Sequence, residues 1–163
     1  MNNPLKYTDP NGEFIFSYAF NFFKGFFKGK NPFKTGWKGI KNEVKLYGGL
    51  FHTDSNKSFL GRYWEFWSRI TWQLPQTVLG FSVNYHFNNF GLVENVTHEY
   101  GVTAVDAGIK GAITIGNYTT GPRGYKADWK DHLFVHEYGH YIQSQQFLRN
   151  ERCDHIRPLY TRE

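Results

Sequence analysis

One pentapeptide in this chain, His136-Glu137-Tyr138-Gly139-His140, has residue types and spacing suited to chemistry. Two histidines four residues apart project from one face of a helix, so both imidazoles can reach one zinc ion. The glutamate beside the first histidine can hold a metal-bound water and take its proton, while the metal polarises a carbonyl. The spacing predicts zinc-assisted (Zn2+) peptide-bond hydrolysis, with Glu137 as general base and His136 and His140 as ligands.

A catalytic zinc ion normally takes a third protein ligand, and the residue pattern leaves that ligand open. The extended pattern HExxHxxGxxH is absent, because Gln143 and Gln146 stand where its glycine and third histidine would be. Any third ligand must therefore come from elsewhere, and the downstream candidates are Asp154, His155, Glu151 and Glu163.

An incomplete copy of the motif occurs earlier in the chain. His98-Glu99-Tyr100-Gly101 repeats its first four letters, but Val102 replaces the second histidine. This copy lies in an alternating segment typical of a strand, where His98 shares a face with apolar residues. We therefore predict that His98 is a core histidine, with a place in the lining of the site as the alternative.

The amino-terminal elements that must support the motif are predicted from hydrophobic spacing. Helices are expected over 14–28, 37–51 and 59–73, with Pro75 closing the third. On the first helix a narrow polar stripe runs through Ser17, Asn21, Lys24 and Lys28. The rest of that helix is apolar, which favours packing of its apolar face in the core over placement in a membrane interface.

The hydrophobic period then changes from helical to alternating. The alternation predicts a three-stranded antiparallel meander over 79–87, 93–105 and 112–118. A last helix, opening near Asp128 or Asp131 and running to about Gln146, carries the motif. The expected fold class is α+β: amino-terminal helices, a small antiparallel β-meander, then a zincin-like HExxH active-site helix.

Composition excludes several classes of protein. The 163 residues are 20% aromatic and 20% charged, with a single cysteine, Cys153. This excludes a disordered chain, an intrachain disulfide scaffold and a Cys-rich zinc module. The chain has no run of 18 apolar residues and no apolar stretch near Met1, so neither a transmembrane helix nor a signal peptide is expected.

Positive charge is concentrated in one segment. Between Lys24 and Lys45 there are seven lysines against one acid, Glu43, while the whole chain has a net charge of +5. Lysine without arginine favours a solvated helix face and linker, so no nucleic-acid partner is expected. The Phe/Lys-rich segment 14–45 leaves a membrane surface open as a partner.

Two stretches resemble a known family. Residues 2–13, NNPLKYTDPNGE, resemble the run that closes the core of rearrangement-hotspot (RHS) repeat proteins. Residues 112–118, AITIGNY, and 136–145, HEYGHYIQSQ, resemble the HExxH-bearing, toxin-like domains that follow such cores. The resemblance implies a zincin-like arrangement in which the strand before the active helix aligns the substrate. The aligning residues would be Ile113, Thr114, Ile115, Gly116 and Asn117.

The resemblance also implies a domain organisation and partners. Residues 1–13 would end an RHS core, 14–146 would form the zincin-like domain, and 147–163 would be an atypical tail. That tail holds four of the seven arginines and no lysine, which predicts a truncated or out-of-frame ending. The parent protein would be exported or on the cell surface, with a protein or peptide substrate and a cognate immunity protein.

Three functions remain open at this point. The first is a zinc metallopeptidase-type domain of an RHS-associated polymorphic toxin, acting through Glu137. The second is a catalytically dead, truncated remnant that lacks the third zinc ligand. The third is a membrane-active module built from 14–45.

Overall fold

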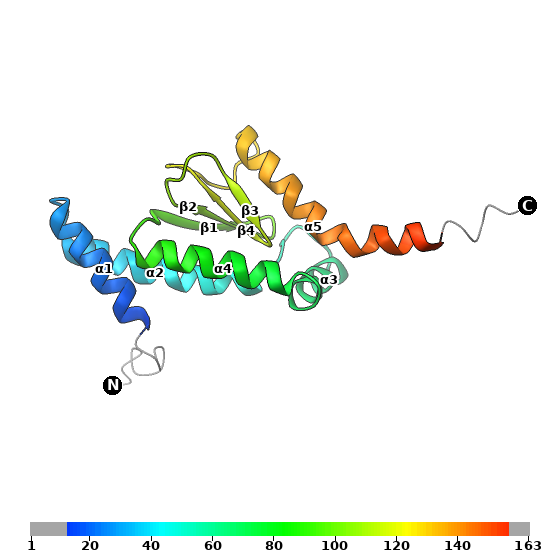
Figure 1. The fold of residues 1–163 in the computed structure, drawn as a ribbon, viewed down its shortest axis with the longest axis horizontal. Coiled ribbons are helices and arrows are strands. Elements are labelled where there is room, and N and C mark those ends of the chain that lie inside the picture. Colours follow the sequence, from blue (N-terminus) through cyan, green and yellow to red (C-terminus); the bar gives the residue numbers. More distant parts are fainter. Residues whose placement is uncertain (1–12, 157–163) are drawn as a thin grey trace, which may run out of the picture.

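The computed structural model describes residues 13–156, and it describes side chains from 15 to 145. Four helices come first: α1 (Glu13–Phe27), α2 (Pro32–Phe51), α3 (Phe59–Ile70) and α4 (Leu74–Asn89). A sheet and a last helix follow: β1 (Asn95–Glu99), β2 (Val102–Asp106), β3 (Ile113–Ile115), β4 (Tyr118–Gly121) and α5 (His132–Ile156). Figure 1 shows α2 and α4 below the sheet, α1 and α3 at the two ends of this helical layer, and α5 beside the sheet. The predicted α+β class is confirmed.

The sheet is mixed, with strand order β1-β2-β4-β3. β1 with β2 and β3 with β4 form antiparallel hairpins, while β2 and β4 pair in parallel. The first hairpin turns at Tyr100 and Gly101, whose φ angles are 54° and 78°. Two consecutive positive φ angles are typical of a tight hairpin turn that matches the strand twist.

Two apolar clusters lie on opposite faces of the sheet. The cluster on the side of α2 and α4 contains Leu46, Val93, Val96, Val105, Ala107 and Tyr118. The cluster on the side of α5 contains Val102, Ala104, Tyr125, Phe134 and Tyr141. The residues of β2 thus alternate between the two clusters, as the period of a strand requires. All five residues of β2 are buried, so this strand is the centre of the fold.

The four amino-terminal helices turn their small and polar side chains inward. On α2 the buried residues are Gly36, Gly39, Asn42, Glu43, Leu46 and Gly49, and on α4 they are Thr77, Gly80, Asn84 and Asn88. On α1, Ser17 and Asn21 are buried, while Phe16 and Phe23 are about 60% exposed, at 61% and 58%. The expectation that the apolar face of the first helix packs in the core is therefore wrong.

Close approach of backbones explains this inversion. A Cβ added at Gly39 would lie 2.5 Å from Asn21 Nδ2 and 2.8 Å from the Ser17 carbonyl oxygen. Asn21 Nδ2 donates to the backbone oxygens of Ser17 and Asn88, at 2.8 and 3.1 Å. Asn88 Nδ2 in turn donates to the Gly39 oxygen at 2.9 Å. Small residues and asparagine hydrogen bonds, rather than Phe packing, join α1, α2 and α4.

The predicted strand over 79–87 is wrong, because this segment lies inside α4. The buried residues of α4 recur at helical spacing and are polar or small, so the apolar alternation does not select the inward side. Asn84 illustrates the packing: its Oδ1 accepts from Thr120 Oγ1 of β4 at 2.8 Å. Pro75 opens α4 instead of closing α3.

The predicted three-stranded meander is also wrong. Segment 93–105 divides into β1 and β2, and segment 112–118 divides into β3 and the first residue of β4. Gly116, with a φ of 61°, allows the second turn.

The predicted capping of the last helix is confirmed at Asp131, whose Oδ1 accepts from Leu133 N at 2.9 Å. The helix continues beyond the expected end at Gln146 as far as Ile156. In the described part of the chain, no helix is long and apolar enough to cross a membrane.

Candidate metal and peptide site on helix α5

Helix α5 is fixed against the sheet by its buried side, which leaves the motif histidines exposed. Phe134 and Tyr141 are completely buried, whereas His136 and His140 face solvent. The Tyr141 hydroxyl donates to Glu65 Oε1 at 2.7 Å and accepts from Arg69 Nη2 at 3.1 Å. α3 therefore holds the α5 turn that carries His140.

The two motif histidines are arranged as a pair of ligands would be. Their Nε2 atoms lie 3.2 Å apart, and their rings are perpendicular. Two nitrogens bound to one tetrahedral zinc at about 2.0–2.1 Å would be separated by about 3.3 Å. The residues present therefore fit a shared metal ion, with no movement of the helix required.

Gln143 selects the form of His140 that a metal needs. Its Oε1 lies 3.3 Å from His140 Nδ1. An amide oxygen only accepts hydrogen bonds, so Nδ1 carries the proton and Nε2 keeps its lone pair. Such a hydrogen bond also orients a ligating imidazole. The sequence reasoning treated Gln143 only as a departure from a longer motif and missed this role.

The side chain of Glu137 points from α5 to the edge strand of the sheet. It is only 5% exposed, and its Oε2 lies 2.7 Å from Thr114 Oγ1. The same hydroxyl is 3.0 Å from the Glu137 backbone oxygen, so its single proton serves one acceptor at a time. The hydroxyl fixes the carboxylate and links it directly to β3.

The predicted substrate-aligning segment is only partly a strand. Ile113, Thr114 and Ile115 form β3, at the edge of the sheet and paired with β4. Gly116 and Asn117 form the turn after it, where Asn117 Nδ2 donates to the Gly49 oxygen at 2.7 Å. The strand residues lie beside Glu137, while the turn residues anchor the hairpin to α2.

Three of the four candidate third ligands lie far along the same helix from the histidine pair. Glu151, Asp154 and His155 lie on α5 itself, between 11 and 15 residues beyond His140. At 1.5 Å per residue, that places their backbones about 16–22 Å further along the helix. Glu163 lies outside the described residues. Within the described residues, no group of three His, Cys, Asp or Glu side chains could hold a metal ion.

A buried ion pair on α3, between Arg69 and Glu65, contacts the buried side of α5 through Tyr141. The sequence analysis did not predict it. Arg69 Nη2 lies 2.6 Å from Glu65 Oε1, and both side chains are almost fully buried. Arg69 also donates to the backbone oxygens of His52 and Gly101. A signal was present in the sequence: opposite charges four residues apart on an otherwise aromatic helix.

His98 of the incomplete motif lies in β1 and is half-buried, as predicted for a core histidine. Its Nδ1 lies 3.1 Å from Thr103 Oγ1, and its ring is 5.1 Å from that of His52. Burial, helped by the neighbouring His52 and Lys45, lowers the pKa of His98 to about 4. A neutral imidazole at this position suits packing between α2 and the sheet.

The chain was compared with protein-family models, curated proteins and solved structures. No family model, curated protein or solved structure matches it significantly. The RHS-like run over 2–13 lies outside the described residues except for its last residue, Glu13.

Proposed function

We propose that this chain is a zinc metallopeptidase-type domain that hydrolyses peptide bonds. The observation that carries the proposal is the 3.2 Å separation of the His136 and His140 Nε2 atoms on one exposed face of α5. Glu137, next to this pair in the chain, is held at the edge strand by Thr114. Ligand spacing, a carboxylate and an edge strand together support this reaction class.

Each residue has a distinct part in the proposed reaction. His136 and His140 would hold the zinc ion, and Gln143 would keep His140 in the ligating tautomer. A bound zinc ion would lower the pKa of a water molecule and polarise the scissile carbonyl. Glu137 would serve as the base for that water, and the Thr114 hydroxyl, which donates to Oε2, would orient its carboxylate. The backbone of β3 pairs with an extended substrate as an added strand.

We also propose that the domain belongs to an RHS-associated polymorphic toxin. Support comes from residues 2–13 and from the sequence around the motif, both of which resemble that family. The substrate would then be a protein or peptide of a target cell, and a cognate immunity protein would bind the domain.

A second candidate is a catalytically inactive form of the same site. Glu151, Asp154 and His155 lie 11 to 15 residues beyond His140 on the same helix, and this distance favours the inactive form. Two histidines alone would hold zinc weakly, since a catalytic site normally uses three protein ligands.

Metal content and hydrolysis together test both candidates. The purified chain is dialysed against equimolar zinc, its metal is quantified, and cleavage of unfolded casein is followed. We expect one zinc per chain, lost in His136→Ala, and cleavage lost in Glu137→Gln with the metal retained. His132→Gln is the matched control, because His132 is exposed on the same helix one turn earlier.

The outcomes separate the candidates. Zinc binding without cleavage would support the inactive form. Absence of zinc at equimolar concentration would contradict the metallopeptidase and leave the inactive form, whose two histidines alone would bind zinc weakly.

A further inference from the structure

A large aromatic surface covers the outer side of α1 and the start of α2. We define this aromatic face by Phe16, Phe20, Phe23, Phe26, Phe27 and Phe33, each between 50% and 83% exposed. Contiguous exposed apolar patches of this kind mark interaction sites. Figure 1 shows α1 and α5 at opposite ends of the fold, so this face is separate from the histidine pair.

The aromatic face cannot turn inward without breaking the fold. The opposite side of α1 is held by hydrogen bonds: Ser17 Oγ donates to Asn89 Oδ1, and Asn21 Nδ2 donates to two backbone oxygens. Ser17 and Asn21 are buried, so turning α1 over would break these hydrogen bonds across the helix interface. The packing of the fold therefore commits α1 to an apolar outer surface.

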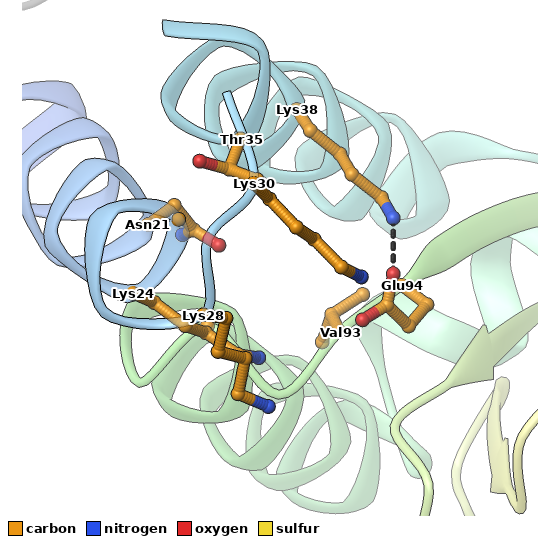
Figure 2. A pocket seen from close by; sticks show the side chains of 10 residues that line it. Asn21, Lys24, Lys28, Lys30, Thr35, Lys38, Val93 and Glu94 are labelled. Atoms are coloured by element: carbon orange, nitrogen blue, oxygen red, sulfur yellow. Dashed lines mark hydrogen bonds and ion pairs between the residues drawn. The ribbon is translucent and has the colours of Figure 1, made fainter. Parts of the chain in front are cut away.

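A cationic pocket opens at the carboxyl end of α1. It has a volume of about 110 Å³, and its lining includes Lys24, Lys28, Lys30 and Lys38 with one acid, Glu94. Four ammonium groups against one carboxylate leave a net charge of +3 on the lining. Figure 2 shows Lys38 paired with Glu94, Lys30 reaching toward the same carboxylate, and Lys24 and Lys28 side by side. We call this cavity the lysine pocket.

The electrostatics of the lysine pocket favour an anionic occupant. Burial, with Lys28, Arg123 and Lys38 nearby, lowers the pKa of Lys24 despite the opposing effect of Glu94. Two neutral side chains of the lining, Asn21 and Thr35, already donate hydrogen bonds to backbone oxygens. The lysines are therefore the donors that an occupant would meet. An oxyanion would offset the repulsion among the ammonium groups and accept hydrogen bonds from them.

The lysine pocket and the aromatic face meet at one edge. Phe20 precedes Asn21, and Phe90 precedes Gly91, both of which line the pocket. The rings of Phe20 and Phe90 are exposed and lie 6.1 Å apart. A cationic site with an apolar rim matches a phospholipid, which presents a phosphate directly above its acyl chains.

We propose that α1 and α2 dock on an anionic phospholipid surface, with the aromatic face in the headgroup–acyl boundary and a headgroup phosphate in the lysine pocket. Charge complementarity selects lipid over a second copy of the chain. Two copies would bring together two basic segments, each with seven lysines against one acid between Lys24 and Lys45. The docking is independent of the zinc chemistry.

Vesicle binding tests the proposal. The full chain is mixed with vesicles of phosphatidylcholine alone, or of equal parts phosphatidylcholine and phosphatidylglycerol, and co-sedimentation is measured. We expect binding to the anionic vesicles, weakened by salt. Lys24→Gln/Lys28→Gln should weaken binding about thirtyfold, from about 1 kcal/mol per lysine. Phe16→Ser/Phe23→Ser should weaken it at least tenfold, an order-of-magnitude figure from the lost apolar burial.

Matched controls separate the pocket from general charge. Lys34→Gln/Lys41→Gln removes the same charge from the same basic segment, at exposed positions outside the pocket, and should weaken binding only about threefold. Val135→Ser removes an exposed apolar side chain from α5 and should have no effect. Circular dichroism checks that each variant is folded.

A measurement on the unaltered chain keeps the test independent of the variants. Trp37 is 52% exposed on α2, so lipids brominated in the upper acyl chain should quench its fluorescence.

Four results would overturn the proposal. The first two are failure to bind either vesicle and equal losses in the pocket and control pairs. The third is complete displacement by inorganic phosphate at matched ionic strength with Phe16→Ser/Phe23→Ser unchanged, which would assign the pocket to free phosphate. The fourth is a dimer in sedimentation equilibrium that Phe16→Ser/Phe23→Ser dissociates, without vesicle binding, which would assign the aromatic face to a second copy.

Discussion

The helical layer α1–α4 and the sheet with α5 solve the same packing problem in opposite ways. In the sheet region, apolar side chains such as Val102, Val105 and Phe134 are completely buried, and the motif histidines face solvent. In the helical layer, Asn21 and Asn88 are buried and Phe23 is exposed. The difference shows that an amphipathic pattern reveals two faces of a helix without fixing which of them turns inward.

The type of contact in each region explains which side chains it buries. Around β2, burial of apolar surface provides the stabilisation, so the fold buries whichever side chains are apolar. Between α1, α2 and α4, glycines let the backbones approach, and asparagine side chains hydrogen-bond across the gap. Contacts of this type are typical of helices whose outer faces lie in an apolar medium.

The largest expected contrast comes from truncating one phenylalanine in each region. Phe134→Ala should destabilise the protein by about 3–5 kcal/mol, because it leaves a cavity against the sheet. Phe23→Ala should change the free energy of unfolding by less than about 0.5 kcal/mol, because Phe23 is exposed. Urea unfolding measures both. Equal losses in the two variants would remove the distinction between the regions.

The link between the regions is the next test. Arg69→Ala leaves Glu65 buried without this partner and should lower the free energy of unfolding by about 3 kcal/mol or more. It also removes a hydrogen bond to Tyr141, so α5 should open more often. Replacing both partners, in Arg69→Met/Glu65→Leu, should recover most of that stability. Thermal unfolding measures the free energies, and hydrogen exchange in α5 reports the loosening. A double variant as unstable as the single one would contradict this view of the ion pair.

The packing of α1 on α2 can be tested with a pair of glycines. Gly39→Ala should destabilise the protein by about 1–3 kcal/mol, because its Cβ would meet Asn21 and the Ser17 carbonyl. Gly48→Ala is the control on the same helix, since its Cβ would meet only His98 Nε2, at 3.6 Å. There the higher helix propensity of alanine should leave stability unchanged or slightly raised. Chemical unfolding of both variants decides, and a neutral Gly39→Ala would refute the close approach.

The smallest expected effect is a pH dependence at the junction of α2 and β1. Burial lowers the pKa of His98 from 6.5 to about 4, so the folded state disfavours its protonation. The stability from neutral His98 is complete above pH 6.5 and is lost as pH falls through about 4. His98→Gln should flatten this slope in urea unfolding, while His132→Gln, at an exposed position, should not. An unchanged slope in His98→Gln would exclude this histidine as the cause.

Prediction from sequence succeeded where a residue pattern is compatible with only one local structure. Asp131 caps the last helix, and His136 and His140 share its exposed face. It failed where two solutions competed, as in segment 79–87, whose apolar alternation suits a strand equally well. There the helical stripe that includes Gly80 and Asn84 packs against the β3–β4 hairpin and overrides the alternation.

The sequence by itself determined the α+β class, the cap of the last helix and the local spacing of the HExxH motif, because these depend on a few neighbouring residues. Only the tertiary structure decided which helix faces are buried, that Thr114 meets Glu137, and that four lysines converge on one pocket. These features join residues far apart in the chain, and their energies depend on backbone approach and burial. Local sequence patterns carry no information about how closely two backbones approach or which side chains become buried.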